Sequence, residues 1–177
     1  MLSIDRYREI YRILDSSAPA VYDCGTLCGA ACCNGASFAN EESYIYLLPG
    51  EMDYLESVGC ELKAVKEKHS DHNLPKSWGE YVYVAHCPGK NECKREVRPI
   101  QCRTFPLQPY ISPDGEFKMI LCNSDLPYSC PFIEGEVAVS EDFHRTAYEA
   151  WSILIEDDKI RDLVKMDSED MGVHGTV

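Results

Sequence analysis

The sequence predicts an α+β fold: a single small domain with helices at its two ends and a loop-rich, cysteine-rich middle that contains a β-hairpin. The longest stretches of helical periodicity lie at the two ends of the chain, whereas the middle contains short runs of aromatic and β-branched residues. All ten cysteines also fall in the middle, between residues 24 and 130. Irregular connections as long as those in the middle are uncommon in a compact domain unless something fixes them.

The first predicted element is an amphipathic helix near the N-terminus. Its apolar side chains recur at spacings of three and four, and Ser3 is the expected N-cap. These apolar residues are Ile4, Tyr7, Ile10, Tyr11 and Leu14. The sequence SSAP that follows, residues 16–19, is expected to end the helix.

Extended segments are predicted in the middle of the chain. A short strand before Pro49 is followed by a brief helix that ends at Gly59, and residues 78–87 predict a strand that ends at Cys87. Residues 107–122 predict a β-hairpin, because the sequence SPDG between two extended runs has Pro and Gly where a type I turn favours them. The hairpin is expected to place Cys122 at its far end.

Two helices are predicted after the cysteine-rich middle, within residues 140–166. The first has Ser140 as its N-cap and one apolar face. That face contains Phe143, Ala147, Trp151 and Leu154. A second, short helix follows over residues 158–166. We therefore expect one domain over residues 1–166, with the cysteines in residues 24–130, and a flexible tail over residues 167–177.

Charge and hydropathy narrow the class of protein. The formal net charge of −13 disfavours nucleic acids and anionic membranes as partners, because Lys and Arg drive binding to both. The N-terminal segment is charged and lacks the apolar core of a signal peptide, and no window is apolar for long enough to cross a bilayer. We therefore expect a cytoplasmic protein, whose thiols stay reduced.

Nine of the ten cysteines fall into three groups that predict a metal site. They are Cys24, Cys28, Cys32 and Cys33, then Cys87, Cys93 and Cys102, then Cys122 and Cys130. Thiolates bind zinc and iron, and both usually take four thiolates when no histidine contributes. In a reducing compartment such clusters favour a metal over disulfides. The isolated Cys60 is expected to be an ordinary, small buried residue.

The sequence leaves the arrangement of these thiols open. If residues 24–33, which we call the cysteine box, form a helix, Cys24, Cys28 and Cys32 share a face and Cys33 does not. If the glycines let the box wrap as a loop, all four thiols reach one metal. Nine candidates also allow two sites, or one site with bystander thiols. We expect one site, in which Cys122 and Cys130 complete the coordination that the cysteine box begins.

The second group of cysteines lies in a basic segment of this acidic protein. Arg98 and Arg103 are the candidates for stabilising the net negative charge of a four-thiolate zinc site from outside its ligands. The alternative for this segment is a solvated basic surface loop. His86 precedes Cys87 and is a further candidate ligand.

Two stretches together resemble the YkgJ-like cysteine-cluster family of zinc- or iron-chelating proteins. That family has a box of closely spaced cysteines that ends in a Cys-Cys pair, and then a segment with Arg-Pro, Cys-Arg and aromatic-Pro pairs. In this chain the box is residues 24–33, with three residues where the family has two between its cysteines. The second segment is matched by Cys93, Glu96, Arg98, Pro99, Cys102, Arg103, Phe105 and Pro106. The resemblance implies a metal-binding domain over residues 24–130.

A second interpretation is an iron–sulfur redox protein or enzyme. Cys87-Pro88 and Cys130-Pro131 match the Cys-Pro pair that ends a bacterial ferredoxin motif, although the spacing in the cysteine box differs from the ferredoxin patterns. Some members of the family it resembles are described as flagellin lysine methylases. The sequence has no Gly-rich fingerprint for S-adenosylmethionine, so we do not assign that activity.

Overall fold

The computed structural model confirms the predicted α+β class. It describes residues 1–20, 24–33, 44–87, 93–123 and 126–174. The helices in these residues are α1 (Ile4–Asp15), α2 (Gly25–Cys28), α3 (Glu51–Ser57), α4 (Ile100–Thr104), α5 (Glu141–Leu154) and α6 (Asp158–His174). The strands are β1 (Tyr44–Tyr46), β2 (Ala64–Lys68), β3 (Tyr81–His86), β4 (Leu107–Ile111) and β5 (Phe117–Leu121). Short 3-10 turns connect several of them.

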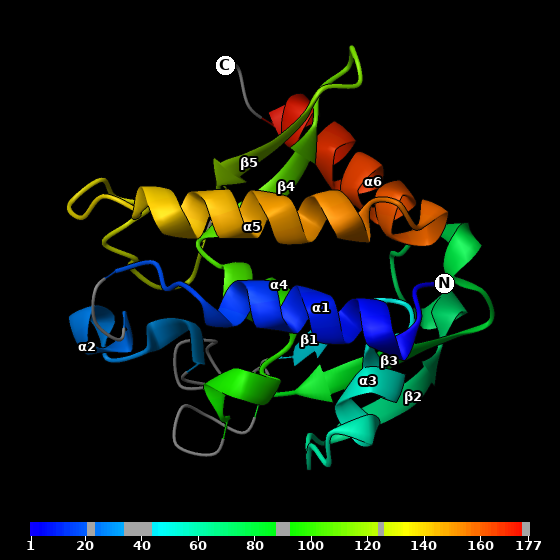
Figure 1. Cartoon of the computed structure of the whole chain (residues 1–177). Coiled ribbons are helices and arrows are strands. Elements are labelled where there is room, and N and C mark those ends of the chain that lie inside the picture. Colours follow the sequence, from blue (N-terminus) through cyan, green and yellow to red (C-terminus); the bar gives the residue numbers. More distant parts are fainter. Residues whose placement is uncertain (21–23, 34–43, 88–92, 124–125, 175–177) are drawn as a thin grey trace.

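The elements stack in layers around α1 (Figure 1). On one side of α1 lie α3 and a three-stranded antiparallel sheet with the order β1-β3-β2. On the other side α5 runs antiparallel to α1, and beyond α5 lie α6 and the β4-β5 hairpin. The short helix α4 lies between these layers, and α2 lies at one end of the molecule. No helix in the described part of the chain is long and apolar enough to cross a bilayer.

Helix α1 forms for the predicted reasons, with one exception. The Ser3 hydroxyl accepts a hydrogen bond from the Arg6 N–H and so caps the first turn. Four of the five predicted apolar side chains are buried in the core: Tyr7, Ile10, Tyr11 and Leu14. Ile4 was predicted on the same face but is 38% exposed. The apolar contact therefore begins one turn into the helix.

The predicted strands are present, and the structure adds one more. In the hairpin, Leu107 pairs with Leu121 and Ile111 with Phe117, and the Gly115 N–H donates to the Ser112 carbonyl as the turn requires. Strand β2, which the sequence analysis did not predict, pairs with β3 along its whole length. It is an edge strand whose sequence, AVKEK, is dominated by charged residues, so it lacks the pattern of a half-buried strand.

The second of the two predicted C-terminal helices is longer than predicted. Ser140 caps α5 by accepting from the Phe143 N–H, and the predicted apolar face of α5 is buried. Helix α6 continues to His174, so the prediction that it ends at residue 166 is wrong. Ser168 lies in the added turns, is buried, and accepts a hydrogen bond from the Ile111 N–H of β4. The helix continues because its last turns dock on the hairpin; residues 175–177 lie outside the described residues.

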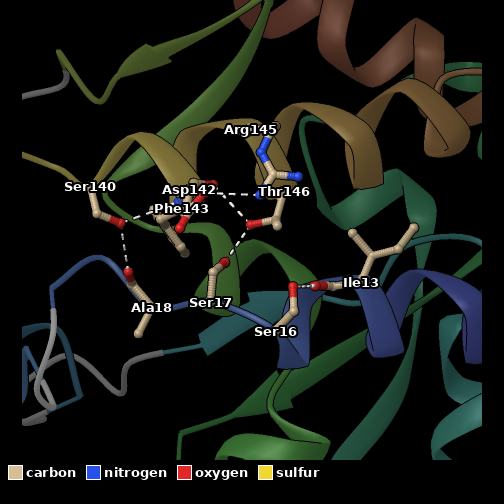
Figure 2. A network of polar contacts seen from close by, with 9 residues as sticks. All are labelled: Ile13, Ser16, Ser17, Ala18, Ser140, Asp142, Phe143, Arg145 and Thr146. Carbon is tan, nitrogen blue, oxygen red and sulfur yellow. Dashed lines mark hydrogen bonds and ion pairs between the residues drawn. The ribbon is translucent and has the colours of Figure 1, made fainter.

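The segment between α1 and the cysteine box is fixed to the start of α5. Figure 2 shows the Ser140 hydroxyl donating to the Ala18 carbonyl (3.1 Å) and the Ser17 hydroxyl in contact with that of Thr146. The Ser140 N–H also donates to the Pro19 carbonyl (3.1 Å). These bonds hold residues 17–19 against α5, immediately before the chain enters the cysteine box.

A buried carboxylate connects three helices. Glu51, the first residue of α3, is fully buried and accepts hydrogen bonds from the Tyr11 hydroxyl (2.9 Å), the Leu48 N–H (2.9 Å) and the Ile100 N–H (2.7 Å). Burial raises the pKa of Glu51, while these donors and the Arg103 guanidinium lower it, and the net direction is a rise. Because Ile100 is the first residue of α4, Glu51 fixes the start of that helix relative to α1 and α3.

We expect Glu51→Gln to destabilise the protein. A glutamine has one oxygen acceptor where the carboxylate has two. Its amide NH₂ group replaces the second oxygen and faces a buried N–H or O–H donor, which is left without an acceptor. The expected loss in free energy of unfolding is about 1–3 kcal/mol, measured by urea denaturation. Glu56→Gln in the same helix is the control, because Glu56 is exposed and should change stability little. Equal effects of the two substitutions would contradict the role given to Glu51.

Candidate functional site

The cysteine box folds as a helical turn followed by a reversal, which combines the two predicted alternatives. Helix α2 contains Cys28, and Cys24 immediately precedes it. Gly29 and Ala30 then adopt left-handed backbone conformations, with φ of 65° and 58°. A 3-10 turn over Ala31–Cys33 follows. Because the chain reverses at Gly29 and Ala30, Cys32 and Cys33 do not continue the face of α2. An alanine at positive φ is itself unfavourable and marks a strained point in the box.

The other cysteines come from the ends of regular elements. Cys87 directly follows β3, as predicted, and Cys93 precedes the 3-10 turn over Arg95–Val97. Cys102 lies in α4, whose ends are held by Glu51 and by the Trp151 indole, which donates to the Thr104 hydroxyl (3.1 Å).

The last predicted pair follows the hairpin. Cys122 comes directly after β5, and its N–H donates to the Pro106 carbonyl (2.8 Å). Cys130 lies farther along, in the segment between β5 and α5. All ten cysteines are free thiols, and Cys122 and Cys130 are both buried.

A cavity of about 220 Å³ brings together six of the nine predicted ligands. Cys33, Cys87, Cys93 and Cys102 line it, and Cys24 and Cys32 lie at its border with the smaller cavity described below. His86 also lines the larger cavity. Residues from the cysteine box, from the end of β3 and from α4 therefore meet at one place, although they are far apart in the sequence.

The cavity is cationic although the protein is acidic. Arg95, Arg98 and Arg103 line it, and no Asp or Glu lies among the described lining residues. The chain as a whole has a formal net charge of −13. Cations gathered beside thiols stabilise the thiolate form, which is the form that binds metals.

Arg98 is in electrostatic contact with three of the thiols. Although burial lowers its pKa, Cys33, Cys93 and Cys102 raise it, and the net direction is a rise. The guanidinium is half-buried and donates to the Cys93 carbonyl (3.3 Å). Its Nε–H is buried and has no hydrogen-bond partner among the described residues.

Two thiols of this cavity, Cys33 and Cys102, have raised pKa values. Burial raises the pKa of Cys102 well above its ordinary value, and Cys33, Cys93 and Cys87 raise it further. The Cys32 thiol is the main cause that raises the pKa of Cys33 to about 11, against the opposing effects of Cys87 and Arg98. A cation is therefore needed before these neighbouring thiols can all be ionised.

Arg103 has a different environment from Arg98. Its side chain is fully buried, pairs with Asp15 at the end of α1 (2.6 Å), and lies over the Tyr11 ring, with 5.1 Å from Cζ to the ring centroid. It also donates to the Glu96 carbonyl (3.4 Å). Arg103 therefore attaches α4 to α1 and reaches the cavity wall at the same time.

A second, smaller cavity of about 20 Å³ is lined by three thiols of the cysteine box and by Cys130. Its four cysteines are Cys24, Cys28, Cys32 and Cys130. Tyr128 lies between the two cavities and lines both. Tyr128 and Gln101, which also lines the larger cavity, were not predicted as site residues, because no motif requires a tyrosine or a glutamine at these positions.

Two cysteines lie apart from these groups. Cys122 lines neither cavity, and Cys60 is half-buried against the hydrophobic core, where its thiol contacts the Val97 carbonyl (3.8 Å). Among the described residues, no three His, Cys, Asp or Glu side chains are close enough together to hold a metal ion in the positions shown. A metal that binds here must draw the thiols of a cavity toward it.

Comparison of the chain with protein-family models, with curated proteins and with solved structures gives no match. The resemblance to the YkgJ-like family therefore stays a prediction based on the two motifs.

The cavity predicts a difference in thiol reactivity. In reduced, metal-free protein that retains its circular-dichroism spectrum, iodoacetamide should modify Cys87 at least several-fold faster than Cys102. Cys87 is exposed, whereas burial and three neighbouring thiols hold Cys102 in its unreactive protonated form. Mass spectrometry of the digested protein after timed labelling measures both rates. Equal rates in folded protein would contradict this description of the cavity.

Proposed function

We propose that this protein binds a metal, zinc or iron, through cysteine thiolates at the larger cavity. The observation that carries the proposal is the meeting of Cys33, Cys87, Cys93 and Cys102 on the wall of one cavity, with Arg98 beside three of them. Four thiolates complete the coordination of zinc or of an iron–sulfur cluster. Arg98 then offsets part of the negative charge that four thiolates leave on the site.

The separation of the four thiols in the sequence supports a role for a metal in folding. The four thiols come from three separate segments, so the unfolded chain cannot hold them together. A metal that binds only the folded arrangement stabilises it by its binding free energy. We also propose a cytoplasmic location, which would keep the thiols reduced and ready to bind a metal.

An iron–sulfur centre is the second candidate, and the size of the cavity favours it. A cavity of about 220 Å³ exceeds the ~150 Å³ that holds a benzene-sized molecule in another protein, so it offers far more room than one metal ion needs. A cluster of several iron and sulfide ions makes use of such a volume, and a redox protein or enzyme would use the cluster for electron transfer.

Purification without oxygen tests both candidates. Visible absorption and elemental analysis should show a colourless protein with stoichiometric zinc, or a brown protein with iron and acid-labile sulfide. A folded protein that contains neither metal, and takes up neither when reduced and supplied with zinc or with iron and sulfide, would refute metal binding.

Cys102→Ser should lower bound metal and thermal stability together. Cys102 is held in place by α4 and lies among the thiols of the larger cavity, so its loss removes one ligand of four. Cys60→Ser is the control, because Cys60 is half-buried at a different place and should leave the metal content unchanged. Elemental analysis and thermal unfolding measure the two effects. The same metal content in both variants would show that Cys102 is not a ligand.

Arg98→Gln should weaken metal retention without removing a ligand. Loss of the positive charge beside three thiolates should lower metal affinity about 10–100-fold, measured by competition with a chelator. Arg98→Lys keeps the positive charge, so its metal affinity should be closer to that of the native protein. An unchanged affinity in Arg98→Gln would show that the guanidinium does not stabilise the thiolates.

A further inference from the structure

The thiols divide into two sets, and we propose that Cys24, Cys28, Cys32 and Cys130 form a second, mononuclear metal site, separate from the centre held by Cys33, Cys87, Cys93 and Cys102. This inference rests on the proposed function and deepens it. It replaces the expectation of one site, to which Cys122 and Cys130 both contribute, with two sites of four thiolates each and with Cys122 in neither.

The walls of the two cavities support this division. Cys33, Cys87, Cys93 and Cys102 line only the larger cavity, and Cys28 and Cys130 line only the smaller one. Cys24 and Cys32 border both. The four thiols that line only the larger cavity are enough to complete one metal site. We therefore assign the two shared thiols, Cys24 and Cys32, to a second set of four with Cys28 and Cys130.

The two cavities differ in the size of the metal centre that they can accept. The smaller one, at about 20 Å³, has room for one particle about as large as a water molecule, which needs ~10–15 Å³. It is also walled by Phe105, Pro106 and Phe132 and has no cationic lining residue among those described. A single divalent ion, which supplies its own positive charge to four thiolates, suits this site, and a four-thiolate zinc site is the closest chemical class.

The reversal in the cysteine box explains how one short segment serves two sites. Cys32 and Cys33 are adjacent, with 3.8 Å between their sulfur atoms, and the two sets of thiols meet at this pair. Because the 3-10 turn directs consecutive side chains differently, Cys32 borders the smaller cavity and Cys33 does not.

The test compares metal content in four variants purified without oxygen. Cys130→Ser should lose about one metal ion per chain and keep the metal centre of the larger cavity. Cys102→Ser should lose the metal centre of the larger cavity and keep the single ion of the smaller one. The double variant should lose both. The matched control is Cys122→Ser, since Cys122 and Cys130 are equally exposed, at 8%, but only Cys130 lines the smaller cavity. If Cys130→Ser fails to fold, Cys28→Ser, at a half-buried position of the same set, replaces it.

Each other outcome has a distinct meaning. Complete loss of metal from folded Cys130→Ser or Cys28→Ser would show one shared centre and overturn the second site. Full retention of metal in both variants would overturn it too, while leaving the centre of the larger cavity intact. Equal losses in Cys122→Ser and Cys130→Ser would overturn the ligand set. A native protein that binds no metal at all would instead refute the proposed function.

Discussion

The buried carboxylate of Glu51 is the interaction on which the position of the thiols depends. Glu51 lies in the first turn of α3. One of its carboxylate oxygens accepts hydrogen bonds from the Ile100 N–H at the start of α4 and from the Tyr11 hydroxyl of α1. Cys102 lies only two residues after Ile100. The hydrogen bonds of this one buried side chain therefore set the position of Cys102, a central ligand candidate, relative to the core. Arg103, next to Cys102, adds a second connection to α1 through Asp15.

Two arginines, Arg98 and Arg103, place positive charge beside the thiols of the larger cavity. Arg103 is buried and paired with Asp15, so it mainly holds α4 in place, whereas the charge of Arg98 acts on three thiols. The two arginines come from one motif, yet they have different roles. The positive charge of Arg98 is stabilised when the thiols beside it become thiolates. The metal binding proposed above would produce those thiolates.

Sequence patterns predicted those parts of the fold that local physics determines. The caps at Ser3 and Ser140 and the turn at residues 112–115 are local, and each matches the structure. Strand β2 and the last turns of α6 were missed because both depend on a distant partner, β3 for the strand and the hairpin for the helix. Glu51 was missed for the same reason: nothing in its own segment shows that a carboxylate will accept from a residue in α4.

For the candidate site, too, the sequence predicted what depends on neighbouring residues and missed what depends on distant ones. Spacing in the sequence identified which cysteines belong to clusters, since that is a local property. It could not assign them to cavities, because the assignment depends on Gly29 and Ala30 reversing the chain and on Cys130 returning to the box from beyond the hairpin. The reversal gives two neighbouring cysteines, Cys32 and Cys33, different surroundings. The two metal sites proposed above would therefore share one short turn of backbone, in which each of two adjacent residues contributes a ligand to a different site.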